Sequence, residues 1–209
     1  MFDSVDLKRN EGFRDYVLLH LLYDSGARAF EIAGLSLDDF DPDTRRLTLL
    51  GKGSRTRILE LWPKTAQLLE KYIAKHRKKP MQPHETTLFT NQRRAPLTRF
   101  GIHRLCRRYL EKTLSKKRLK SLNPVHSFRH SCAIHMLNAG YALTDIKNRL
   151  GHERLESTMI YLKLETSIKK EIQKEYIAHT KSLMNQDRKL DELLDWGDRD
   201  KILNWLDGL

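Results

Sequence analysis

The sequence predicts a mixed α+β fold that is mainly α-helical and contains a small antiparallel sheet of three strands. Apolar residues recur at helical spacing along most of the chain, two strand-like runs flank the glycine-rich segment 51–54, and glycine or proline separates successive elements. With 209 residues, the chain is long enough to bury a core. We expect one domain over residues 1–164 and a helical extension over residues 165–209.

The first part of the chain is predicted to form two helices. Apolar residues recur at helical spacing over residues 13–25, and Gly26 stands where such a helix would end. A second, shorter apolar run covers residues 29–35. The aspartates and the proline of residues 38–42 then predict a loop in which the chain reverses.

The sheet is predicted from short runs of apolar and β-branched residues. Residues 46–50 and 57–61 flank the turn segment, so we expect a β-hairpin that carries Lys52 at its turn. Residues 86–90 are expected to add the third strand.

The remaining elements are helices with recognisable end signals. Pro63 suits the first turn of one helix, Thr98 the N-cap of the next and Pro124 the start of a third. Thr144 and Gly151 suit the two ends of a later helix. After the helix that begins at Pro63, further helices are expected over residues 99–114, 124–139, 143–150, 157–164 and 166–184.

The charge of the chain indicates a polyanionic partner. Its 39 Lys and Arg against 27 Asp and Glu give a formal charge of +12, and nucleic acid is the expected partner for such a field. No apolar stretch of membrane-spanning length and no signal-peptide core are present, so we expect a soluble cytoplasmic protein without a membrane partner. Cys106 and Cys132 could pair with each other, but that compartment favours free thiols.

Four basic residues are candidates for contact with DNA. Arg104, Arg107 and Arg108 lie on the helix that Thr98 begins, and Lys117 lies in the loop expected beyond it. A run of charges is often only a solvated face. The alternative, which we adopt as the DNA-binding prediction, is that these side chains contact phosphates.

Several residues have the properties needed to break a phosphodiester without a metal. The transition state carries charge on non-bridging oxygens, which the planar guanidinium of arginine matches. The reaction also needs a nucleophile, an acceptor for its proton and an acid for the leaving 5′ oxygen. Tyr161 could be the nucleophile, and His126 and Arg129 share one face of a predicted helix. Taken singly, each of these residues has an ordinary structural explanation.

The combination resembles a known family. In order along the chain stand GARAFE at residues 26–31, GKG at 51–53, HSFRH at 126–130, LGH at 150–152 and TMIY at 158–161. These blocks resemble the signature of the tyrosine recombinase, or phage integrase, family, and an ordered match of five blocks is far more specific than any one of them. The resemblance spans residues 13–164 and implies the fold of that family's catalytic domain. Ala27 replaces a usual leucine, a departure that concerns packing only.

The resemblance implies roles for individual residues. Arg28 and Arg129 would clamp the scissile phosphate and stabilise the charge of the transition state. Lys52, on a mobile turn, would be the general acid for the leaving oxygen, although an exposed turn lysine is the plainer explanation. Tyr161 would be the nucleophile.

The histidines and one carboxylate complete the implied site. His126 would assist removal of the proton from the nucleophile, and His152 would bind the phosphate or orient Tyr161; how they divide this work is left open. Glu31 is expected to hold the active-site cations in place rather than to act in catalysis. His130 also matches the family block, but we interpret it as structural and expect it to make a local hydrogen bond.

The implied activity is site-specific DNA recombination. Attack by Tyr161 would form a 3′-phosphotyrosyl bond and free a 5′ hydroxyl, and a 5′ hydroxyl of a partner strand would then reseal the DNA. Because the phosphotyrosine conserves the bond energy, we expect no metal, no ATP and no other cofactor. The alternatives are DNA relaxation like that of a type IB topoisomerase and a silent DNA-binding relative. The intact catalytic set argues against the second alternative.

Two expectations concern the ends of the chain. Family members usually carry a helical core-binding domain before the catalytic one, and we expect it to be absent here because the first helix begins almost at once. Residues 186–209 combine apolar side chains with a net charge of −3. The first 185 residues therefore carry +15, and the whole chain carries +12. This tail could pack on its own body. We favour docking on a neighbour, which would join copies into dimers to tetramers on double-stranded DNA.

Overall fold

The computed structural model describes residues 1–155 and 157–161. The described residues belong to one compact unit, residues 1–161. The helix expected over residues 166–184 and the C-terminal tail therefore lie outside the described residues. The described elements are η1 (Phe2–Ser4), α1 (Asn10–Ser25), α2 (Ala29–Ala33), η2 (Leu37–Asp39), β1 (Phe40–Asp41), β2 (Arg46–Leu50), η3 (Lys52–Ser54), β3 (Thr56–Glu60), α3 (Pro63–Lys71), the π-helical turn η4 (Tyr72–His76), α4 (Arg99–Glu111), α5 (Lys116–Lys120), α6 (Pro124–Asn138) and α7 (Leu143–Leu150).

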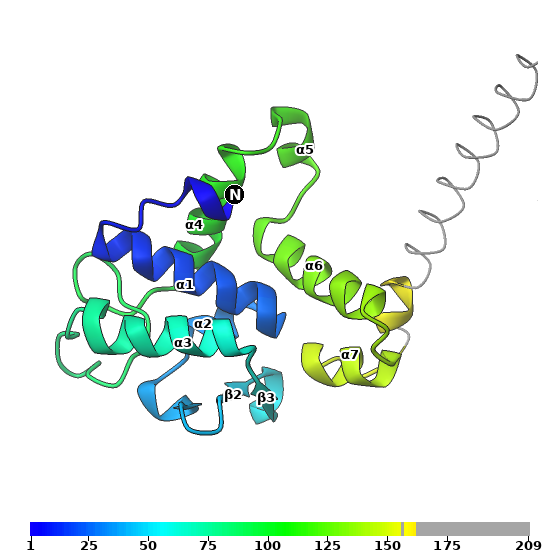
Figure 1. Ribbon diagram of the computed structural model, residues 1–209, viewed down its shortest axis with the longest axis horizontal. Helices are drawn as coiled ribbons and strands as arrows, with labels where there is room; N and C mark the ends of the chain where they lie inside the picture. Colours follow the sequence, from blue (N-terminus) through cyan, green and yellow to red (C-terminus); the bar gives the residue numbers. More distant parts are fainter. Residues whose placement is uncertain (156, 162–209) are drawn as a thin grey trace, which may run out of the picture. The chain divides into compact units, whose positions relative to one another are not determined.

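Helix α1 runs through the larger hydrophobic core, where it packs against α3, η4 and α6 (Figure 1). Val17, Leu18 and Leu21 are fully buried there, as their helical spacing predicts. The helix ends at Gly26, whose φ of 58° is a left-handed conformation that glycine adopts without strain. A side chain at this position would also collide with Leu150, because a Cβ atom would lie 2.5 Å from its Cδ2.

The sheet has three antiparallel strands in the order β1-β2-β3. The predicted hairpin is confirmed: Arg46 lies opposite Glu60, and Leu50 lies opposite Thr56. Its turn is η3, in which Gly53 has a φ of 71°. A mainly helical chain with one small sheet is the fold class that the sequence predicts.

The third strand is β1, and its prediction at residues 86–90 is wrong. That segment makes only isolated bridges to other parts of the chain. The amide of Leu88 donates to the carbonyl of Leu35, and the carbonyl of Phe89 accepts from the amide of Leu97. Because loops already use these main-chain groups, no continuous row remains for pairing with a strand.

The helix ends mostly follow their sequence signals. The Thr98 hydroxyl caps α4 by accepting a 3.1 Å hydrogen bond from the amide of Gly101. Residues 116–120, expected as a loop, instead form the short helix α5. The Ser115 hydroxyl accepts from the amide of Arg118 at its start, and lysine and arginine are good helix formers.

A second, smaller hydrophobic cluster is formed by side chains of α6, of α7 and of the residues after α7. Helix α7 has the bounds expected from the sequence, with Ala142 as its N-cap and Thr144 in its first turn, and it ends at Gly151 with a φ of 65°. None of the described helices is long and apolar enough to cross a membrane. The cluster consists of Cys132, Ala133, Met136, Ile146, Leu150 and Tyr161.

Candidate active site

Glu31 is the centre of a polar cluster at the start of α2. The backbone amide of Arg28 donates a 2.7 Å hydrogen bond to Glu31 Oε2, and Arg28 Nη1 donates to Oε1 at 3.2 Å. The Glu31 side chain is fully buried, whereas that of Arg28 is 34% exposed. The structure thus places the predicted supporting carboxylate directly on the predicted first arginine and leaves part of that arginine open to solvent.

Arg57 in β3 is a member of this cluster that the sequence analysis missed. Its Nη1 and Nη2 donate to the two oxygens of Glu31 at 2.7 and 2.9 Å, and its Nε donates to the carbonyl of Arg149 at 3.1 Å. The sequence did contain a signal for Arg57. Side chains alternate between the two faces of β3, and Arg57 therefore shares the inward face with the buried Leu59. A charged residue on an inward face requires a partner.

The pKa of Glu31 reflects these contacts. Burial alone would raise it, but the hydrogen bonds from Arg57 and from the Arg28 amide, together with both positive charges, lower the pKa below its usual value. Glu31 is therefore a carboxylate, and the three side chains carry a net charge of +1. Arg28 is the more exposed of the two arginines, at 34% against 14% for Arg57.

Arg129 is buried beside the C-terminal ends of α1 and α7. Its Nη1 donates to the carbonyl of Gly26 at 2.6 Å and its Nη2 to the carbonyl of Leu150 at 2.7 Å, and the residue is only 4% exposed. Burial, with the nearby charge of Arg28, lowers the pKa of Arg129 to about 10, so it is still a cation near neutral pH. A guanidinium has more donors than these two bonds use, so it can also bind an anion.

His152 follows the left-handed turn at Gly151. Its Nδ1 lies 2.9 Å from the hydroxyl of Thr158, which fixes the direction of the ring. Burial and the charges of Arg129 and Arg28 lower the pKa of His152 to about 4. His152 is therefore neutral near pH 7 and can donate or accept one hydrogen bond at Nε2.

Tyr161 is buried rather than presented to solvent. It is 2% exposed and packs in the smaller hydrophobic cluster, with its ring parallel to that of His152 at 6.5 Å between centroids. Burial raises the pKa of Tyr161, the charge of Arg129 acts in the opposite direction, and the net shift is upward. The phenol is thus protonated in this structure.

Two further histidines lie along α6 near Tyr161. The His130 ring meets the Tyr161 ring edge-on at 5.4 Å, and His126 lies 5.7 Å from His130 on the other side. Burial lowers the pKa of both histidines, and the charge of Arg129 adds to this in each case. The local hydrogen bond expected for His130 is not found, because its buried Nδ1 has no partner among the described residues.

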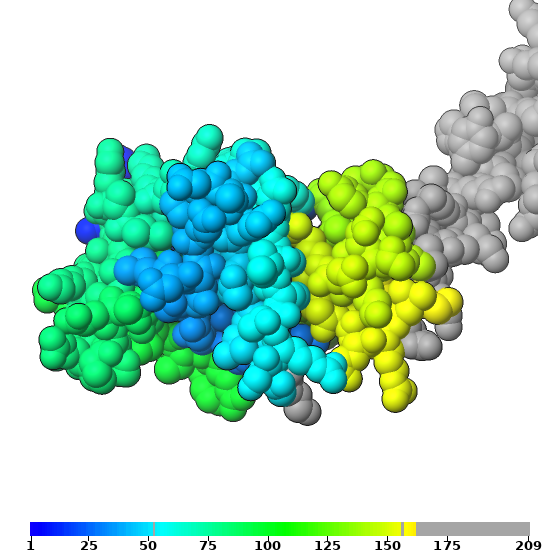
Figure 2. Space-filling model, turned by 90° about the horizontal axis from the view of Figure 1, so that it is seen from below, coloured from blue at the N-terminus to red at the C-terminus, as the bar shows by residue number. Residues whose placement is uncertain are grey.

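Part of this cluster lines a cleft of about 510 Å³ between α2, the hairpin and the segment after α7. Arg28, Arg57 and His152 line it, and Gly51 brings the backbone next to Lys52 to its edge. Figure 2 shows the hairpin (cyan) beside the surface of α7 and the residues after it (yellow), in agreement with the contacts between β3 and α7. Within the described part of the chain, no three His, Cys, Asp or Glu side chains are placed to hold a metal.

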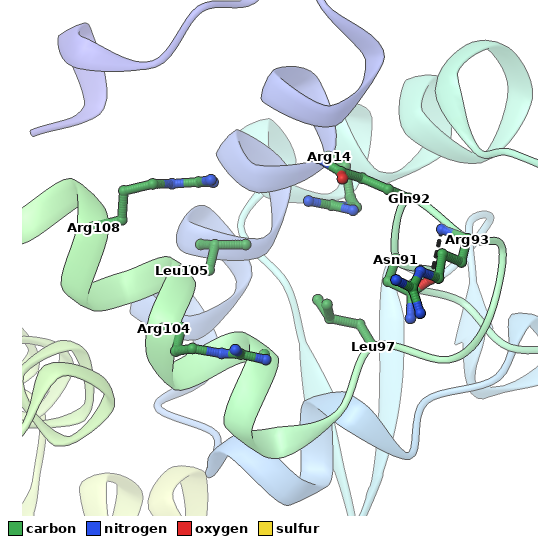
Figure 3. A pocket seen from close by; sticks show the side chains of 9 residues that line it. Arg14, Asn91, Gln92, Arg93, Leu97, Arg104, Leu105 and Arg108 are labelled. Atoms are coloured by element: carbon green, nitrogen blue, oxygen red, sulfur yellow. Dashed lines mark hydrogen bonds between the residues drawn. The ribbon is translucent and has the colours of Figure 1, made fainter.

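The predicted DNA-binding residues lie away from this cleft, on α4 and α5. Arg104 and Arg108 line a second cleft of about 560 Å³, shown in Figure 3. Arg108 pairs at 2.5 Å with the buried Asp15, and Arg107 pairs at 2.9 Å with Glu111. Lys117 is exposed on α5. Among the described residues, Arg104 has no ion-pair partner.

Comparisons with known proteins show the family of the chain. Residues 4–167 match the sequence model of the phage integrase family. The chain is 33% identical over 166 residues to tyrosine recombinase XerC of Pelotomaculum thermopropionicum, covering 77% of this chain and 53% of the relative. It is 34% identical over 162 residues to tyrosine recombinase XerD of Staphylococcus haemolyticus, covering 77% and 54%. The chain thus spans about half the length of these curated relatives.

A solved structure supports the fold. The site-specific recombinase XerH, in a post-cleavage complex with its palindromic difH substrate, superposes with a TM-score of 0.67 at 22% identity, covering 82% of this chain and 48% of that one. The family match covers most of the chain, and this structural match covers most of the described residues. The chain therefore belongs to the phage integrase family of tyrosine recombinases, and its described residues have the fold of their catalytic domain.

Proposed function

We propose that this chain is the catalytic part of a site-specific DNA recombinase that cuts and rejoins strands through Tyr161. The observation that carries the proposal is that Arg28 and His152, far apart in the sequence, line one cleft, while the buried Arg129 and Tyr161 lie near His152. The curated relatives are named tyrosine recombinases, and the XerH structure holds a cleaved DNA substrate.

The cleft suits a phosphodiester in charge and in hydrogen bonding. The exposed part of the Arg28 guanidinium and the remaining donors of Arg129 supply positive charge for the two non-bridging oxygens. His152, neutral and oriented by Thr158, supplies one further hydrogen bond. With this charge provided by arginine, the developing negative charge needs no metal ion for its stabilisation.

Proton transfer involves Tyr161, which loses a proton, and Lys52, which supplies one. The phenol of Tyr161 must turn toward the phosphate and lose its proton, and His126 is the group proposed to assist. Lys52, at the turn of the hairpin, donates the proton to the leaving 5′ oxygen. Because burial raises the pKa of Tyr161, its activation depends on bound DNA and on the charge of Arg129.

We propose that the second cleft binds the DNA backbone outside the scissile position. Arg14 from α1, Arg93 from the loop before α4, and Arg104 and Arg108 from α4 surround it (Figure 3). Asp15 neutralises part of this charge by pairing with Arg14 and Arg108, which leaves Arg93 and Arg104 as exposed cations without an ion-pair partner among the described residues. Guanidinium groups of this kind position a phosphate backbone without reading its sequence.

We further propose that the C-terminal tail joins copies of the chain on DNA. The support is its sequence, which combines leucines and tryptophans with a net negative charge beside a strongly basic body. Deletion of residues 186–209 should reduce self-association on DNA, measured by sedimentation, while single-strand cleavage remains. An unchanged assembly state would instead favour a tail that packs on its own body.

The central test is a suicide-substrate assay. Nicked duplex DNA traps a covalent adduct, which migrates as a shifted band on a denaturing gel. The wild type should give this band with or without EDTA, and Tyr161→Phe should give none while binding DNA with similar affinity. An adduct with the phenylalanine variant would show that another residue is the nucleophile, and loss of the band in EDTA would reveal a metal requirement.

A further inference from the structure

Arg57 is the least exposed cation of the active-site cluster apart from Arg129. Its side chain is 14% exposed, and the Glu31 carboxylate that it contacts is fully buried. Both terminal nitrogens are used on the same carboxylate, a planar fork-to-fork geometry that arginine forms and lysine cannot reproduce.

The hydrogen bonds of Glu31 are divided between two arginines. Oε1 accepts from Arg57 at 2.7 Å and from Arg28 at 3.2 Å, and Oε2 accepts from Arg57 at 2.9 Å and from the Arg28 amide at 2.7 Å. Arg57 therefore makes the two shorter side-chain contacts. Arg28 is held by a single longer side-chain bond, which leaves its other donors facing the cleft.

Removal of Arg57 would change the net charge of the cluster and the direction of the Arg28 guanidinium. Arg28 and Glu31 alone carry no net charge, whereas the three side chains carry +1. A buried carboxylate that lost two donors would draw in the nearest remaining cation, because an unpaired buried charge is costly. That cation is Arg28, and a guanidinium paired through both nitrogens to the anionic Glu31 would be neutralised and drawn away from the phosphate.

Arg57 also connects the hairpin to the segment that carries His152. Its Nε bonds to the carbonyl of Arg149 in the last turn of α7, and its guanidinium packs so closely on Gly151 that a Cβ there would lie 2.9 Å from Nη1. The glycine of the LGH block thus makes room for Arg57 in addition to its left-handed turn. One side chain therefore contacts two of the five sequence blocks, GARAFE through Glu31 and LGH through Gly151.

We propose that Arg57 is a positioning residue for strand cleavage: it occupies Glu31 so that Arg28 stays free for the scissile phosphate. This inference rests on the proposed function. Because Arg57 acts through Arg28, its loss slows the chemical step much more than it weakens DNA binding.

Single-turnover cleavage of the nicked substrate tests this role. Arg57→Gln should cleave about 10–100-fold more slowly than the wild type, the usual effect of losing a group that orients a reacting residue, with DNA affinity within about threefold. Arg57→Lys should fall between the two, since it keeps the charge without the fork. Arg45→Gln is the matched control, because Arg45 adjoins the same sheet but pairs with Glu60 on the surface. It should cleave at the wild-type rate.

A double variant separates positioning from simple anchoring. If Arg57 acts by occupying the carboxylate, Arg57→Gln combined with Glu31→Gln should cleave at least about fivefold faster than Arg57→Gln alone, because no anion then competes for Arg28. If Arg57 only anchors β3 to α7, the double variant will be no faster than the single one, and the proposal is overturned. Thermal unfolding of each variant shows which of them are folded.

A crystal structure of Arg57→Gln without DNA tests the inference independently of recombinase activity. We expect the Arg28 guanidinium to be paired through both terminal nitrogens with Glu31 and withdrawn from the cleft. An unchanged Arg28 would overturn the inference even if the wild type cleaves DNA. If the wild type forms no adduct but Arg28 moves as expected, the proposed function fails and the positioning of Arg28 by Arg57 stands.

Discussion

The guanidinium of Arg129 donates a 2.6 Å hydrogen bond to the carbonyl of Gly26, 103 residues earlier in the chain. Its other terminal nitrogen bonds to the carbonyl of Leu150. Arg129 therefore joins the end of α1, the middle of α6 and the end of α7. A residue proposed to bind the phosphate is at the same time a cross-link of the fold.

This double role predicts different results for the two proposed clamp residues. Arg28→Ala and Arg129→Ala should each slow cleavage by about two to three powers of ten, the range seen when one donor to a developing oxyanion is removed. Arg129→Ala should also lower the free energy of unfolding by about 2–4 kcal/mol, because two buried carbonyls lose their partner. Arg28→Ala, which removes a partly exposed side chain, should leave it nearly unchanged. Urea unfolding measures this, and equal stability losses would contradict the difference in burial.

Substitution of Gly151 should harm the protein more than substitution of another left-handed glycine. Gly151→Ala and Gly140→Ala both place a side chain at positive φ, which costs about 1–2 kcal/mol. Only at Gly151 does the new Cβ also meet a neighbour, since nothing lies within 4 Å of that position at Gly140. We expect Gly151→Ala to cost at least about 1 kcal/mol more in urea unfolding and to slow cleavage, an overpacking penalty. Similar losses for both variants would show that Arg57 moves aside freely.

Acidification should destabilise the protein through two partly buried histidines, His20 and His152. Burial lowers the pKa of His20 and of His152 to about 4, with Lys64 adding to the effect at His20 and Arg129 at His152. Between about pH 6.5 and pH 4 the unfolded chain therefore binds more protons than the folded one, so stability falls as the pH falls through this window.

The melting temperature as a function of pH tests this expectation. His20 packs against Phe2 and Tyr16, and its buried Nε2 has no hydrogen-bond partner among the described residues. His20→Phe keeps the packing and removes the titrating group, so its melting temperature should fall less between pH 7 and pH 5 than that of the wild type. Parallel curves for the two proteins would exclude His20 as a source of the acid sensitivity.

Loss of Arg104 should weaken DNA binding in a salt-dependent and sequence-independent way. A phosphate contact contributes about one unit to the slope of log affinity against log salt, so Arg104→Ala should reduce that slope by about one. Arg107→Ala should have a smaller effect, because Glu111 already neutralises Arg107. Fluorescence anisotropy with duplexes of different sequence measures both slopes. A slope unchanged by Arg104→Ala would mean that this part of α4 is only a solvated face.

The sequence by itself determined the elements whose signals are local. The helical spacing of α1, the cap at Thr98 and the turn between β2 and β3 depend on neighbouring residues, and all three are found as predicted. The third strand was misplaced because residues 86–90 pair through single hydrogen bonds with the distant Leu35 and with Leu97 in the loop that follows. The family blocks were also readable, because they depend on residue types in a fixed order.

Only the tertiary structure decided how the site residues are connected. Arg57 belongs to no block of the signature, and its role follows from a contact with Glu31 that spans 26 residues. The burial of Tyr161 and the neutral state of His152 likewise follow from packing between segments that are far apart in the sequence. Exposure and pKa depend on which charges and apolar groups surround a side chain, and distant segments bring those groups together only when the chain folds.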